Sequence, residues 1–333
     1  MDLIAMALLF AAAFAASALA CGQVRRLLLR HRVLDRPVAR SVHAAPVPRG
    51  AGLALVPILL LLWLAAPWID PEAAALPWPV LAGTVLVALV SWRDDLAGLP
   101  ALPRLGVQAV AVLIGLVALA QLPPLFQGWL PRPLDLAAGA LLWLWFLNLY
   151  NFMDGSDAVA GGQALTIGIG IAAIALDQGW LDLTAYQGIA LAGVALGFLS
   201  WNRPPAKIFL GDVGSIPLGY LIGWLLLWAA SRGAWAAALI LPAWFLADTT
   251  ITLARRALKH APLLESHAEH SNQQAIKLGH SHAYVALLAL AANLALMVLA
   301  VGAERGERLV GFIGAAATVW LLTRRLKRPP RAS

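Results

Sequence analysis

Long apolar runs, separated by short polar segments, make up most of this chain. Each run is about 15 to 20 residues long, whereas the strands of a membrane barrel alternate polar and apolar positions over about ten residues. The pattern therefore predicts about eleven transmembrane helices, some of them bent or short. The predicted spans lie near residues 3–22, 51–69, 76–92, 105–122, 134–150, 163–177, 184–201, 214–230, 234–254, 283–301 and 309–323.

The composition favours the same class. The chain is 61% hydrophobic and only 12% charged, and it holds 14 tryptophans. A soluble domain cannot bury so many apolar residues, because a single hydrophobic core reaches its maximum size before all of them are buried. We therefore expect an all-α, polytopic integral membrane protein that forms one domain over residues 1–333, with the lipid bilayer as a partner and no nucleic acid.

The basic residues predict the orientation of the helices. No Lys or Arg precedes the first run, whereas Arg25, Arg26 and Arg30 follow it, which is the charge order of a first helix with its N-terminus outside. If the spans alternate in direction, only four of the 24 Lys and Arg residues fall outside, namely Arg132, Arg232, Arg305 and Arg308. The N-terminus is therefore predicted outside the cell and the C-terminus in the cytoplasm.

The stretch LNLYNFMDGSDAVAGG, residues 147–162, interrupts this apolar chain with four polar side chains three residues apart. Asn148, Asn151, Asp154 and Asp157 turn back by about 60° at each step on an α-helix, so one straight helix cannot aim all four at one point. Gly155 offers a break. We expect the two asparagines on the last helical turn and the two aspartates in a turn or a new helix start.

Three further polar clusters fall on the predicted cytoplasmic side: SWRDDLAGLP with Asp94 and Asp95, AKIFLGDVGS with Asp212, and ESHAEHSNQQ with His267 and His270. Acids at the membrane surface on one side favour a cytoplasmic active site, since a transporter more often places them near the bilayer midplane. Paired carboxylates suit a hard divalent cation such as Mg²⁺, which takes one or two of them plus substrate phosphates.

Other polar residues allow more than one interpretation. His267 and His270 are three residues apart and would share a face of a short helix, where they could contact phosphate. Arg49, just before Gly50, could close on a diphosphate or could only help to fix the topology. Asp248 lies inside a predicted helix. An acid there indicates a functional role, unless a hydroxyl of Thr249 or Thr252 hydrogen-bonds its carboxylate.

Taken together, these motifs resemble the polyprenyl-phosphate N-acetylhexosamine-1-phosphate transferases. This family includes the bacterial phospho-MurNAc-pentapeptide translocase and the enzymes that start O-antigen and related glycans. The matching pieces occur in the family order across nearly the whole chain. They are RSVHAAPVPRGAG, the Asp94 and Asp95 pair, NLYNFMDGSDAVAGG, FLGDVGS and the histidine loop.

The resemblance implies transfer of a sugar-1-phosphate from a UDP-sugar to undecaprenyl or another polyprenyl phosphate, with release of UMP and a requirement for Mg²⁺ or Mn²⁺. By resemblance, Asp94, Asp95, Asp154, His267 and His270 are catalytic, and Asp212 and Asp95 hold the metal. The implied substrate-binding residues are His43, Arg49, Asn148, Asn151, Asp157 and Phe209, with Phe209 stacking on uracil.

The sugar, the assembly and the rival functions remain open at this stage. The loop ESHAEHSNQQ lacks the tandem histidines of the GlcNAc and muramyl branches, which favours UDP-FucNAc or UDP-QuiNAc over UDP-GlcNAc. We expect Glu265, Ser271 and Asn272 to border this sugar. A homodimer is compatible with the sequence. We expect the protein in the bacterial inner membrane. The alternative function is a secondary transporter or lipid flippase.

Overall fold

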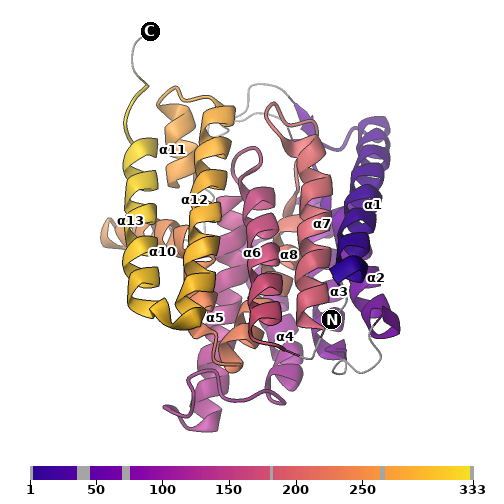
Figure 1. The fold of residues 1–333 in the computed structure, drawn as a ribbon. Helices are drawn as coiled ribbons and strands as arrows, with labels where there is room; N and C mark the ends of the chain where they lie inside the picture. The colour runs from indigo at the N-terminus through magenta and orange to yellow at the C-terminus, as the bar shows by residue number, and fades with distance from the viewer. Residues whose placement is uncertain (1–2, 36–45, 70–75, 181–182, 263–266, 331–333) are drawn as a thin grey trace.

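The computed structural model describes residues 3–35, 46–69, 76–180, 183–262 and 267–330. Apart from the antiparallel pair β1 (Leu34–Asp35) and β2 (Val47–Pro48), its regular elements are helices. One layer is a row of five helices in which each packs on the next, seen from left to right in Figure 1. The row runs α13 (Arg308–Leu326), α12 (His282–Gly302), α6 (Val159–Asp177), α7 (Thr184–Asn202) and α1 (Leu3–Arg30).

The second layer is built around α8 (Asp212–Ser231), which packs on both layers. A helix that is apolar all round needs burial on every side, and 89% of the apolar window of α8 is buried, against 22% for α1. The position of α8 therefore fixes the position of Asp212, its first residue. Its neighbours are α2 (Gly52–Ile69), α3 (Trp78–Ala97) and α5 (Arg132–Met153), with α4 (Ala101–Leu119) packed on α3.

The predicted class is confirmed, whereas the predicted span count is not settled. Seven described segments are long and apolar enough to cross a membrane, with α12 and α13 counted as one continuous stretch through the π-helix Ala303–Glu307. These segments bear out an all-α polytopic fold. The number eleven and the orientation stay predictions.

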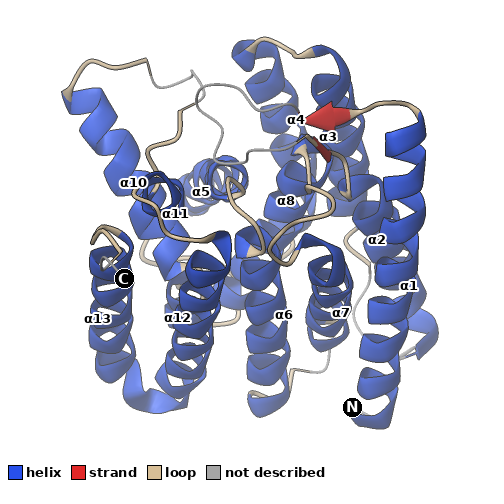
Figure 2. Cartoon of the chain, turned by 90° about the horizontal axis from the view of Figure 1, so that it is seen from above, coloured by secondary structure: helices blue, strands red, loops and turns tan. Residues whose placement is uncertain are grey.

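One predicted span is divided in the structure. The range 234–254 forms two helices, α9 (Trp235–Ile240) and α10 (Ala243–Leu258), which are separated at Leu241 and Pro242. A proline has no amide hydrogen for the helical ladder and clashes with the preceding turn, which explains the break. From there α10 runs away from the row of five helices (Figure 2) and passes beside the start of the short helix α11 (Ser271–Lys277), where Asp248 accepts from the Ser271 amide.

Backbone contacts fix the start of α2 against the start of α8. The amide of Phe209 donates to the carbonyl of Pro48 at 2.8 Å, and the amide of Gly50 donates to the carbonyl of Phe209 at 3.1 Å. At the next turn Gly52 lies directly against Gly214, where a Cβ atom on Gly52 would collide with the Gly214 backbone. Two chain segments about 160 residues apart are thereby held in direct backbone contact.

We predict that Gly52→Ala lowers the melting temperature and that Gly106→Ala does not. An added methyl at Gly52 has to separate α2 from α8, and overpacking of this kind costs about 1 to 3 kcal/mol. Gly106 lies inside α4 with nothing within 4 Å of its ideal Cβ, so alanine is accommodated there. Thermal unfolding of both purified variants in one detergent checks the pair. Equal melting temperatures would contradict the close contact.

Candidate active site

The N-terminus of α8 is capped by a side chain from another helix. No residue of α8 itself supplies a side-chain cap. Instead Asp95 of α3 accepts hydrogen bonds from the amides of Asp212, at 3.0 Å, and Val213, at 2.9 Å. A carboxylate is stabilised there because the first amides of a helix have no partner in the helix and carry partial positive charge. Gly211 adopts φ +74°, and a Cβ there would lie 2.8 Å from the Asp95 carboxylate, so the approach requires glycine.

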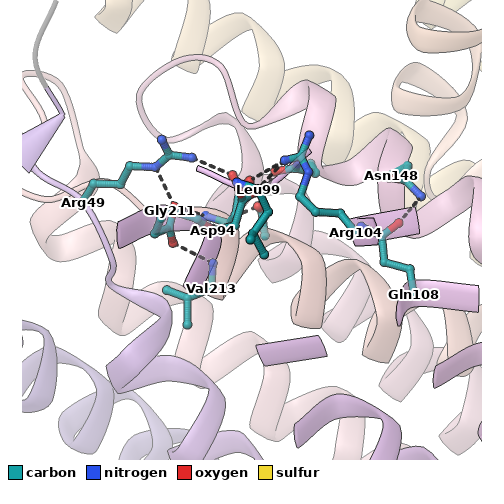
Figure 3. Close-up of polar contacts among 12 residues, drawn as sticks. Arg49, Asp94, Leu99, Arg104, Gln108, Asn148, Gly211 and Val213 are labelled. Atoms are coloured by element: carbon teal, nitrogen blue, oxygen red, sulfur yellow. Dashed lines mark hydrogen bonds and ion pairs between the residues drawn. The ribbon is translucent and has the colours of Figure 1, made fainter. Parts of the chain in front are cut away.

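Two arginines bridge the acids from opposite sides, as Figure 3 shows. Arg49 places Nε 2.9 Å from Asp95 Oδ1 and Nη2 2.6 Å from Asp212 Oδ1. Arg104 places Nη1 2.6 Å from Asp94 Oδ2 and 3.2 Å from Asp212 Oδ2. We call these five residues the acid–arginine cluster. Its side chains come from the segment before α2 and from α3, α4 and α8.

The expected carboxylates therefore converge, and an arginine that the sequence had not singled out joins them. Asp94 and Asp95 are adjacent on α3 but point to different partners, since Asp94 also accepts from the Leu99 amide at 2.5 Å. Sequence reasoning counted Arg104 only toward the topology. The available signal was its position at the start of the helix that follows the Asp94 and Asp95 pair.

The stretch of residues 147–162 folds nearly as predicted. Asn148 and Asn151 lie on the last turns of α5, and α6 begins at Val159. The left-handed residue is Ala158, at φ +63°, and not Gly155. Gly155 lies against the side chain of Gln273 of α11, which would have to move to make room for a Cβ atom.

The two asparagines contact partners that sequence reasoning missed. Asn148 Nδ2 donates to Gln108 Oε1 at 2.8 Å, and Ser215 Oγ donates to Asn151 Oδ1 at 2.5 Å. Both partners lie in apolar helices, where single polar residues stand out, and this was the signal available. Ser215 lies one turn after Asp212, so Asn151 is tied to the same end of α8.

Asp154 lies in the electrostatic field of the cluster. Burial raises the pKa of its carboxyl well above the ordinary value, Arg49 opposes the shift, and the carboxylates of Asp212, Asp95 and Asp157 add to it. A carboxyl with a raised pKa in such a place is a candidate proton donor or acceptor. The predicted catalytic position of Asp154 therefore has an electrostatic basis.

Asp157 is buried deeper than expected of a residue that binds a nucleotide directly. Its side chain is 3% exposed, and Oδ2 accepts from the Ala206 amide at 3.0 Å. His282 Nδ1 lies 3.6 Å from Asp157 Oδ1. Asp157 therefore links the α6 start to the loop before α8 and to α12.

The histidine loop has a different geometry from the one predicted. His267 and His270 do not share a helix face: His267 is in an irregular segment, and His270 is the N-cap residue of α11. Their rings are nevertheless close, with centroids 5.0 Å apart, and both approach the ring of Phe152. The pair is assembled by the turn into α11.

Asp248 orients the second histidine. Its Oδ2 lies 3.0 Å from His270 Nδ1, and Oδ1 accepts from the Ser271 amide at 3.1 Å. The acid inside α10 is thus satisfied by the histidine loop and not by Thr249 or Thr252. With Nδ1 engaged, Nε2 is the remaining nitrogen of His270 for other contacts, and no hydrogen-bond partner within the described residues reaches it.

Two of the residues expected to border the sugar are buried. Ser271 is 2% exposed and Asn272 0%. Asn272 Nδ2 donates to Ser156 Oγ at 2.9 Å, and Trp244 Nε1 donates to Ser271 Oγ. Both side chains are buried and hold α11 in place, whereas the prediction expected them at the edge of the sugar site; contact with the sugar stays a prediction. Glu265, like His43, lies outside the described residues.

The backbone and the side chain of Phe209 are in different environments. Its backbone pairs with Arg49, and its side chain is partly exposed. A ring next to the Arg49 segment is compatible with stacking on a base, and that role stays a prediction.

The carboxylates of the acid–arginine cluster suit a hard cation that needs few protein ligands. Within the described residues, no group of three His, Cys, Asp or Glu side chains forms a ready metal cage. Asp94 Oδ2 and Asp212 Oδ2, however, both lie within 3.2 Å of one nitrogen of Arg104, so they face a common point. Mg²⁺ needs only one or two carboxylates and completes its shell with waters and phosphates. The donor set therefore fits Mg²⁺ better than zinc.

Fold and site together define a polytopic helical membrane protein with a charged centre at one end of its helices. Residues 77–230 match the family model of glycosyl transferase family 4. The chain is 31% identical over 274 residues to a probable undecaprenyl-phosphate N-acetylglucosaminyl 1-phosphate transferase of Bacillus subtilis, covering 78% of this chain and 74% of that protein.

Two further relatives extend this result. A decaprenyl-phosphate N-acetylglucosaminephosphotransferase of Mycolicibacterium smegmatis is 32% identical, covering 81% of this chain and 75% of the relative. A phospho-N-acetylmuramoyl-pentapeptide-transferase of Picosynechococcus is 29% identical, covering 59% and 56%. The chain belongs to glycosyl transferase family 4, which confirms the family resemblance of its motifs.

We predict that His267 makes stability depend on pH below neutrality. Burial lowers the pKa of His267 from 6.5 to about 4, helped by the positive charges of His270, Arg256 and Lys277 and opposed by Glu269. Between these two values the unfolded chain binds more protons than the folded one, so stability rises with pH there and is lost on acidification.

Thermal unfolding from pH 4.5 to 7 tests this prediction on the native chain and on His267→Gln. The native chain should lose stability relative to the variant as pH falls, by about 1 kcal/mol once solvent screening is allowed for. His260→Gln, at an exposed histidine, is the control. Parallel pH curves for the native chain and His267→Gln would contradict the lowered pKa.

Proposed function

We propose that this protein transfers an N-acetylhexosamine-1-phosphate from a UDP-sugar to undecaprenyl phosphate or another polyprenyl phosphate and releases UMP. The observation that carries the proposal is the acid–arginine cluster, in which Arg49 and Arg104 are held by three carboxylates at one end of the helices. Family membership and the activities for which the relatives are named support the same reaction. They favour an enzyme over the alternative of a transporter or flippase.

Both reactants of this reaction are anionic, which is the problem that the cluster can solve. A guanidinium presents paired donors that match phosphate oxygens, so Arg49 and Arg104 are suited to bind the diphosphate of the donor and the phosphate of the acceptor. In phosphoryl transfer, positioning and charge stabilisation supply most of the catalysis.

The transfer makes one phosphorus–oxygen bond and breaks one. An oxygen of the acceptor phosphate attacks the β-phosphorus of the UDP-sugar, the bond to the bridging oxygen breaks, and UMP leaves with the electron pair. A phosphate monoester has its second pKa near 6, so the attacking oxygen is largely ionised at pH 7 and needs little help from a base. The raised pKa of Asp154 suits that residue to exchange a proton at the leaving side.

We propose Asp212 and Asp94 as the residues that would hold Mg²⁺, with Mn²⁺ as a substitute. Asp95, expected earlier as a ligand, is the weaker candidate because both of its oxygens accept from backbone amides of α8. Asp94 Oδ2 and Asp212 Oδ2 instead share the side chain of Arg104, which the ion would have to displace. The ion would supply charge neutralisation at the transferring phosphate. Asp95 would then position Asp212 through the start of α8.

The identity of the sugar is proposed only as an N-acetylhexosamine. The histidine loop favours UDP-FucNAc or UDP-QuiNAc, whereas the names of two relatives carry N-acetylglucosamine. We propose that the product starts a cell-surface polysaccharide such as O-antigen.

The testing experiment measures UMP release by purified protein with undecaprenyl phosphate, Mg²⁺ and each of the three donors in turn. Activity with at least one donor, abolished in Asp212→Asn and reduced about a hundredfold or more in Asp94→Asn and Asp95→Asn, is expected. Asp177→Asn makes the same chemical change at an acid paired with Arg305, away from the cluster, and is the control. No UMP release with any donor, or near-normal turnover of Asp212→Asn, would defeat the proposal.

We also propose that the cluster faces the cytoplasm, where UDP-sugars are made. The charge asymmetry supports this side of the membrane. Two positions at opposite ends of α4 report on it, since Ala97 precedes the helix, Gln121 follows it and both are exposed.

In intact cells, with Cys21 replaced by serine, an impermeant thiol reagent should label Gln121→Cys and should not label Ala97→Cys. After the cells are opened, both should react. Labelling of Ala97→Cys from outside would invert the orientation.

A further inference from the structure

A groove opens on the lateral edge of the protein between α10 and α13, away from the acid–arginine cluster. Its larger part has a volume of about 630 Å³ and is lined mainly by apolar side chains from α9, α10 and α13, among them Ile240, Ala243, Ala316, Val319 and Trp320. A second cavity of about 340 Å³ continues it toward α11. We call the two together the lateral groove.

The two cavities share walls, so they form one continuous path. Residues that line both include Ala247 and Ile251 of α10, Val319 and Thr323 of α13, and Lys327, which directly follows α13. No lining residue belongs to the acid–arginine cluster. The groove exists because α10 leaves the row of helices after the break at Pro242 while α13 stays in it (Figure 2).

One end of the groove is apolar and the other is basic. Arg255 of α10 and Arg324 of α13 line the end that lies toward α11, together with Lys259 and Lys327, which directly follow these helices; all four are exposed. No ion pair to another described residue engages any of them. The acids nearest that end have partners already, since Glu269 pairs with Arg256 and Asp248 with His270.

We propose that the lateral groove binds an anionic phospholipid of the bilayer, with its acyl chains in the apolar part and its phosphate among Arg255, Arg324, Lys327 and Lys259. A basic pocket between helices at the cytoplasmic surface is the arrangement that captures anionic headgroups, and each cation contributes to the attraction. A zwitterionic lipid would leave the excess of positive charge unmatched. This site goes beyond the proposed transfer reaction and uses none of its residues.

The experiment titrates detergent-purified protein with phosphatidylglycerol or phosphatidylcholine and counts bound lipids by native mass spectrometry. The native chain should retain phosphatidylglycerol preferentially and gain thermal stability from it. Arg255→Gln/Lys327→Gln should weaken this binding by about tenfold or more, since one cation near an anionic headgroup contributes a factor of about five.

Arg325→Gln/Arg328→Gln is the matched control, because it removes the same charge from the same end of α13 at residues that do not line the groove. It should change binding by no more than about a factor of two. Ala316→Trp fills the apolar part without any change of charge, and it should also weaken lipid binding. This variant keeps the test informative if the charge variant does not fold.

Four outcomes would overturn the proposal. Equal losses in both double variants would show attraction to general surface charge, and equal binding of the two lipids would show no headgroup selection. Displacement of phosphatidylglycerol by inorganic phosphate would make the site one for a free anion. Displacement by undecaprenyl phosphate at similar concentration would make the groove part of the acceptor's path.

Discussion

The carboxylate of Asp95 at the N-terminus of α8 is the interaction on which the site depends. It joins α3 to the most deeply buried helix of the protein and aligns Asp212 at the same time. Arg49 reaches both acids, so the segment before α2 is held by the same interaction. The helix amides and Arg49 oppose the effect of burial, which raises the pKa of Asp95, so they offset part of the cost of gathering three acids at one place.

The location of this centre follows from the cost of polar groups in a membrane. Charged side chains in the hydrocarbon region are costly unless they are paired, so they gather at helix ends or in the protein interior. Here the helix ends supply both the backbone amides and the short loops that bring arginines to the acids. Asp248 is the exception inside a helix, and it is satisfied by His270 and the Ser271 amide across a short distance.

The sequence was sufficient for the fold class and for most members of the site, because both follow from local patterns. Apolar run length predicts helices, and the order of the motifs identified the acids and Arg49. It was insufficient for partners that only tertiary packing creates. Arg104 and Gln108 sit in an apolar helix whose rotation about its axis is set by packing, so no spacing rule assigns them to Asp94 or Asn148. Ser271 and Asn272 were misplaced because a polar loop residue is expected at the surface, whereas α11 turns both inward against Trp244 and Ser156.

The contact between Gly52 and Gly214 has a consequence for how the protein responds to its bilayer. A transmembrane helix whose apolar stretch is longer than the local membrane thickness can adapt by tilting. Two helices that touch backbone to backbone at their N-terminal ends are expected to tilt about that contact. The separation at this contact is then expected to stay constant while the opposite helix ends move. Arg49 and Asp212 lie just before Gly52 and Gly214 in the chain. We therefore expect the distance between them to change little with membrane thickness.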